Sequence, residues 1–170
     1  MVYNAITQSG TNTVSGSASY RFRRNAMSAK PFFFTGNRTP DTDVDDITGA
    51  LGGPIKRDRA HYFGAWEFVD RSLVDGGRVI SVTPANAAAL GITLPSGGVI
   101  PSRQKVNFAF GKVDYQLHPS TLVTGRYFFF KNLSQANVGA GLTTTDRATD
   151  FNDQMDSAAL QAVTTIGTSR

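Results

Sequence analysis

Segments of about ten residues in which apolar and polar side chains alternate limit the fold of this chain more than any other feature. In residues 14–24, Val, Gly, Ala and aromatic residues occupy the even positions up to 22, and Ser and Arg occupy the odd ones. Successive side chains of a β-strand point to opposite faces, so a period of two predicts a strand with one apolar and one polar face. Helical periodicity is nearly absent. The predicted strands are 14–24, 44–55, 60–71, 105–117, 121–131 and, more weakly, 157–167.

The connections between these segments alternate strictly between short and long. Residues 56–59 and 118–120 are short turns, whereas 25–43, 72–104 and 132–156 are long and polar. Structureless loops longer than about 12–15 residues are uncommon in compact soluble domains. Barrels of the bacterial outer membrane, by contrast, have short periplasmic turns and long extracellular loops. The predicted fold class is therefore all-β: an antiparallel up-and-down meander of about six strands, an incomplete part of a transmembrane β-barrel.

The composition supports this prediction. Hydrophobic residues make up 40% of the chain and charged residues only 18%, with 12 Phe and 17 Gly. A soluble domain with few apolar residues normally carries more charge than this. The net charge of +4 is modest and the basic residues are scattered, so no nucleic-acid partner is expected. No window approaches 18 consecutive apolar residues, and only residues 83–90 predict a helix, with Thr83 as its cap and Pro84 at its first position.

The alternation assigns side chains to the two faces of the predicted wall. A ten-residue strand tilted by about 40° spans roughly 25 Å, the height of the apolar band of such barrels. Aromatic residues near strand ends are typical of the interfacial girdles. The predicted lipid-facing and girdle residues are Tyr20, Phe22, Tyr62, Trp66, Phe68, Tyr115, Tyr127 and Phe129. The predicted lumen-facing residues are Arg21, Arg23, Asp46, Glu67, Lys112, Asp114 and Arg126.

Three phenylalanines interrupt this pattern. Phe108, Phe110 and Phe128 fall on the predicted lumen face, where polar residues are expected. They lie either above the membrane band or against a plug inside the barrel. In the hairpin around residues 118–120, Asp114 and Arg126 are predicted to form a cross-strand ion pair.

No residue pattern predicts catalysis. His61 and His118 lack ligand-like spacing to a second His or carboxylate, and the absence of Cys excludes thiolate metal sites. The acidic run at 41–46 lacks the glycine and closing glutamate of an EF-hand, so a solvated loop is expected there. We expect no catalytic residue, metal site or cofactor, and the chain is not predicted to be an enzyme.

Alternating strands joined by hairpins also suit a soluble β-sandwich or small β-barrel that acts as a binding module. The two interpretations make opposite predictions for Trp66. Its indole faces lipid in a membrane barrel and packs in an interior in a soluble domain.

Three segments also resemble a known family. SGTNTVSGSASYRFRRN (9–25), GALGGPIKRDRAHYFGAWE (49–67) and KVDYQLHPSTLVTGRYFFF (112–130) are similar to the start of the barrel in TonB-dependent outer-membrane receptors. The Oar-like members, which often carry a carboxypeptidase-regulatory-like domain, are the most similar. Trp66 stands where Tyr is usual, and 118–120 replaces the usual polar turn. The matching residues are Thr7, Ser9, Gly10, Thr11, Asn12, Gly16, Ser17, Gly49, Leu51, Gly52, Gly53, Pro54, Ile55, Asp58, Arg59, Phe63, Gly64, Glu67, Val113, Asp114, Leu117, Leu122, Gly125, Arg126 and Tyr127.

The resemblance implies a domain organisation and a function. Residues 1–13 correspond to the end of a plug and its connection to the barrel, and residues 14–170 to the N-terminal portion of the barrel. Family barrels have about 22 strands, and an open edge cannot exist in lipid, so the chain is expected to be a fragment. The implied function is energised passage of a ligand across the outer membrane, where the protein is localised. The implied partners are outer-membrane lipid, the plug and rest of the barrel, and the TonB complex.

Overall fold

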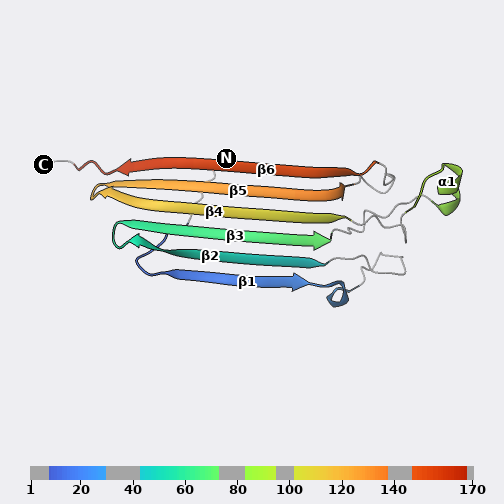
Figure 1. The fold of residues 1–170 in the computed structure, drawn as a ribbon, viewed down its shortest axis with the longest axis horizontal. Coiled ribbons are helices and arrows are strands. Elements are labelled where there is room, and N and C mark those ends of the chain that lie inside the picture. The colour runs from blue at the N-terminus through green and yellow to red at the C-terminus, as the bar shows by residue number, and fades with distance from the viewer. Residues whose placement is uncertain (1–7, 30–42, 73–82, 95–101, 138–146, 168–170) are drawn as a thin grey trace.

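One sheet of six antiparallel strands forms the centre of the computed structural model, which describes residues 8–29, 43–72, 83–94, 102–137 and 147–167 (Figure 1). Each strand pairs with its neighbours in sequence, in the order β1 to β6. This confirms the predicted all-β meander. The strands are β1 (Ser15–Arg23), β2 (Val44–Lys56), β3 (Ala60–Ser72), β4 (Arg103–His118), β5 (Thr121–Asn137) and β6 (Thr149–Thr164).

The turns β2–β3 and β4–β5 lie at one end of the sheet, and helix α1 (Pro84–Ala89) lies beyond the other end (Figure 1). In the β2–β3 turn the Arg59 amide donates to the Lys56 carbonyl at 3.1 Å, and Asp58 has a φ of 58°. Asp is one of the few residues besides Gly that adopt this left-handed conformation readily. The Thr83 hydroxyl accepts a hydrogen bond from the Asn86 amide at 3.3 Å, as predicted for the cap of α1.

Two strands are longer at the loop end than the sequence predicts. β5 continues to Asn137 instead of ending at residue 131, and β6 begins at Thr149 instead of 157. The pairing of Ser134 with Phe151 belongs to this extension. Most of its side chains are polar on both faces, so the apolar–polar contrast is lost while the backbone ladder continues.

The sheet has no apolar core on either side among the described residues. Ala60, Val69 and Ala87 are the only buried hydrophobic residues there, whereas Trp66 is 42% exposed and Leu160 81% exposed. Nothing in the described part of the chain provides the interior that a soluble sandwich requires for Trp66. The fold is a single-layered wall with two open faces.

The N-terminal segment, residues 8–13, crosses β2 and β3 near the turn end before β1 begins. A methyl group on Gly10 would lie 2.1 Å from the Tyr62 carbonyl oxygen and 2.9 Å from that of Gly53. Only glycine therefore allows the backbone of this segment to approach the sheet so closely.

We expect Gly10→Ala to destabilise the protein by about 1–3 kcal/mol, because the added methyl group overlaps backbone atoms that cannot rotate away. Urea unfolding of the protein refolded into lipid vesicles measures this change. Gly111→Ala is the matched control, since a methyl group there would have no atom of the described residues within 4 Å. Equal stabilities of the two variants would contradict this account of Gly10.

Candidate functional site

The strand register separates the predicted site residues into two sets, one on each face of the sheet. We call the two faces the polar face and the aromatic face. The polar face carries all of the predicted lumen-facing residues: Arg21, Arg23, Asp46, Glu67, Lys112, Asp114 and Arg126. The aromatic face carries all of the predicted girdle residues: Tyr20, Phe22, Tyr62, Trp66, Phe68, Tyr115, Tyr127 and Phe129.

A charged group on the polar face joins the first three strands. Arg21 on β1 lies 2.7 Å from the Asp46 carboxylate on β2 and 3.9 Å from that of Glu67 on β3. The Arg21 side chain is 67% exposed, so solvent screens these pairs and they add little stability. Asp46 Oδ1 is buried and has no hydrogen-bond partner among the described residues. The polar face therefore presents a hydrogen-bond acceptor, Asp46 Oδ1, and an exposed guanidinium, that of Arg21.

A second group on the polar face centres on Asp114. Its carboxylate lies 3.5 Å from Lys112 Nζ and accepts a hydrogen bond from the Thr124 hydroxyl at 2.6 Å. The predicted ion pair between Asp114 and Arg126 is wrong, because Thr124 is the residue opposite Asp114. The tight β4–β5 turn sets this register, and it places Arg126 opposite Lys112, a like charge.

The N-terminal segment is bound to the polar face at both of its ends. The Lys112 ammonium donates to the Ser9 hydroxyl at 2.7 Å. Asn12 Oδ1 accepts from the Asp58 amide and from His61 Nε2, both at 2.8 Å, and Asn12 Nδ2 donates to the Asp58 carboxylate. We call Asn12, Asp58 and His61 the clasp. His61 has no ligand-like spacing to another His or carboxylate in the sequence, and only the fold brings it to Asn12.

Aromatic rings form a further part of the polar face. Phe63 and Phe110 have ring centroids 6.2 Å apart, and Phe108 meets Phe128 edge to face at 4.9 Å. Phe63 pairs in register with Lys112, so these rings lie among the charged groups of the wall. The polar face therefore offers both apolar and charged surface to whatever packs against it.

On the aromatic face, rings pack in pairs along the same strand. Trp66 and Phe68 stack with centroids 6.2 Å apart and planes 8° apart, and Tyr20 stacks on Phe22 at 5.7 Å. The indole N–H of Trp66 donates to Asn107 Oδ1 at 2.8 Å. An apolar ring with a satisfied polar edge is typical of side chains at a membrane–water interface.

The described part of the acidic run is held by residues in and just after β1. Asp43 accepts from the Asn25 amide at 2.7 Å, and Asp45 lies 2.6 Å from Arg24 Nη2. The hydrogen bond to Asp45 raises the pKa of the Arg24 guanidinium, which stays charged. Asp41 lies outside the described residues. Within the described ranges, no three His, Asp or Glu side chains gather in a way that could hold a metal ion.

A family model described as an outer membrane beta barrel domain matches residues 6–96, more than half of the chain. The chain therefore belongs to this family of outer-membrane β-barrel domains, and its location is the outer membrane. No curated protein and no solved structure matches it. None of the helices in the described ranges is long and apolar enough to cross a membrane.

We expect Asn12→Ala to release the N-terminal segment, because the substitution removes all three hydrogen bonds of the clasp. With each bond contributing about 0.5 kcal/mol at this exposed position, amide exchange in residues 8–13 should be about tenfold faster. Hydrogen–deuterium exchange with mass spectrometry provides the measurement. Thr11→Ala is the control, because the Thr11 hydroxyl donates only locally, to the Thr13 carbonyl. Unchanged exchange in the Asn12 variant would show that the clasp does not hold the segment.

Proposed function

We propose that the chain is part of a TonB-dependent outer-membrane receptor, which passes a ligand across the outer membrane using energy supplied by the TonB complex. Its role is binding and passage, with no catalysis. In this proposal residues 1–13 leave a plug, the polar face lines the lumen, and the aromatic face contacts lipid.

The attachment of the N-terminal segment to the polar face carries this proposal. In the segment, Ser9 bonds to Lys112 on β4, and Asn12 bonds to the β2–β3 turn. A chain that enters a barrel only to start its first strand has no need to cross the inner side of three strands. A chain that leaves a plug inside the lumen must do so. The three sequence segments shared with TonB-dependent receptors support the same assignment.

The residues that face the lumen suit contact with a plug. Charged side chains and the Phe63–Phe110 and Phe108–Phe128 pairs share the polar face. A simple water-filled pore would favour a uniformly polar wall, whereas a packed plug needs both hydrogen-bonding and apolar partners. Asp46 Oδ1, which has no hydrogen-bond partner in the described part of the chain, is one acceptor that a plug donor could satisfy.

The orientation of the two faces is tested by the fluorescence of Trp66. In vesicles of acyl-brominated lipid, the indole should be strongly quenched, because it lies on the lipid-facing side. The quenched component should disappear in the Trp66→Phe variant, which corrects for any tryptophan elsewhere in the full protein. Fluorescence that bromine leaves unchanged would reverse the assignment of the faces.

The dependence on TonB is tested with the full protein and the periplasmic domain of TonB. We expect the two to cross-link in outer-membrane vesicles, and the cross-link to be lost when the TonB-contacting segment of the plug is replaced. A folded, plug-containing barrel that does not cross-link to TonB would contradict the proposal and favour a passive barrel. The Trp66 measurement does not depend on this result, so the two assignments can fail separately.

A further inference from the structure

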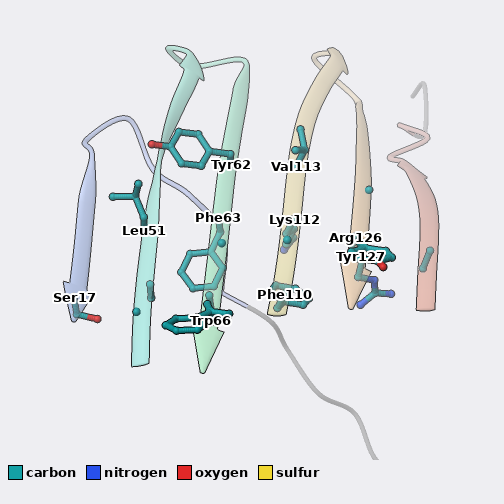
Figure 2. Close-up of a pocket in the computed structure, with 17 residues that line it drawn as sticks. Ser17, Leu51, Tyr62, Phe63, Trp66, Phe110, Lys112, Val113, Arg126 and Tyr127 are labelled. Atoms are coloured by element: carbon teal, nitrogen blue, oxygen red, sulfur yellow. The ribbon is translucent and has the colours of Figure 1, made fainter. Parts of the chain in front are cut away.

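One carboxylate on the polar face has two cations within reach. The side chains of Asp114 and Lys112, two positions apart on β4, are only 11% and 12% exposed. Arg126 on β5, the neighbouring strand, pairs in register with Lys112 (Figure 2). Thr124 pairs with Asp114. Arg126 is therefore a diagonal neighbour of Asp114, at a separation that long side chains can span.

Lys112 uses this carboxylate only weakly. Its ammonium lies 3.5 Å from Asp114 Oδ2, whereas charge-assisted hydrogen bonds from nitrogen to oxygen are about 2.7–2.9 Å long. The ammonium donates instead to the Ser9 hydroxyl, at 2.7 Å. Lys112 therefore holds the N-terminal segment and leaves Asp114 able to accept a stronger partner.

The second cation, Arg126, has no carboxylate of its own. It is exposed, and its guanidinium forms no ion pair with any residue in the described part of the chain. The residue opposite it on β6 is Ala159, which carries no charge. Like charges directly opposite each other on neighbouring strands repel, so the pairing of Arg126 with Lys112 is unfavourable. A guanidinium can present two N–H groups to one carboxylate in a fixed geometry, which an ammonium cannot.

We propose that Asp114 exchanges one cation for the other when the N-terminal segment leaves the wall. With the segment bound, Lys112 lies between Ser9 and Asp114. With the segment released, Lys112 turns toward solvent and Arg126 pairs with Asp114, which stabilises the released state. The role of this exchange in the passage of a ligand rests on the proposed function, whereas the exchange itself is tested without TonB.

The surrounding contacts suit such an exchange. The Thr124 hydroxyl donates to Asp114 Oδ1 at 2.6 Å, so one oxygen of the carboxylate is held in place while Oδ2 remains for the guanidinium. The Arg126 side chain is exposed and can reorient without displacing a packed neighbour. Asn12 fastens the other end of the segment through separate hydrogen bonds. The exchange therefore governs the Ser9 end of the segment.

The test measures how fast an acylating ester modifies the Lys112 amine in the full protein in lipid vesicles, with peptide mass spectrometry as the readout. The amine reacts in the released state, so its rate reports the population of that state. We expect Arg126→Gln to slow the reaction about threefold, because the released state loses its ion pair. Arg21→Gln, which removes another exposed guanidinium from the same face, should leave the rate unchanged. The rate at the exposed Lys56 is the internal reference and the check of folding.

A double variant separates the exchange from direct repulsion between the two cations. Arg126 also repels the Lys112 ammonium, but that effect does not need Asp114. In the exchange, Arg126→Gln should have no further effect once Asp114→Asn is present. An equal or faster rate in Arg126→Gln than in the unmodified protein would overturn the proposal, as would an equal slowing with and without Asp114→Asn.

If Asp114→Asn does not fold, a zero-length carbodiimide coupling in the Arg126→Lys variant decides instead. An amide bond between the side chain at position 126 and Asp114 would show that the two groups meet. Coupling of Asp114 to Lys112 alone would contradict the exchange.

Discussion

The backbone hydrogen-bond ladder is the constraint on which the rest of this structure depends. Within a bilayer there is no water to satisfy an unpaired N–H or C=O, so each strand must be paired on both sides. In the described sheet, β2 to β5 meet this condition, and β1 and β6 each have one paired side. Within the described sheet β1 and β6 are the edge strands, and a closed barrel is the arrangement in which such edges are paired as well. Pairing also frees the side chains from forming a core, which is why so few described apolar residues are buried.

With no core, the two faces can serve different surroundings. On the aromatic face, stacked rings such as Trp66–Phe68 present apolar surface and keep their polar atoms bonded within the sheet. On the polar face, ion pairs such as Arg21–Asp46 remain exposed, so they contribute little to stability and stay available to a partner. Because the side-chain period is two, a register slip of one residue would exchange the two environments along the whole strand. The register is thus the feature that assigns each residue to the aromatic face or to the polar face.

The features that depend on this period of two could be predicted from the sequence. Contacts between residues that are far apart in the sequence could not. The six strands and their meander follow from alternation, and Thr83 and Pro84 identified α1. The loop-end parts of β5 and β6 were not predicted, because polar residues occupy both faces there and the alternation is lost. The Asp114–Arg126 pair was wrong because the register near a tight turn depends on how the turn closes, and Thr124 now faces Asp114. The hydrogen bond between His61 and Asn12 could not be predicted, because the two residues lie 49 positions apart in the sequence.

Glycines allow the backbone of the N-terminal segment to lie directly against the backbone of the sheet, with no side chains between them. Gly10 lies against the carbonyl oxygens of Gly53 and Tyr62, and Gly52 lies beneath it on β2. Such contact leaves no room for a side chain, so its specificity must come from the polar residues that flank it, Ser9 and Asn12. Both bond to groups on different strands, Lys112 on β4 and the β2–β3 turn. The segment therefore ties together β2, β3 and β4, which the backbone ladder connects only through neighbouring pairs.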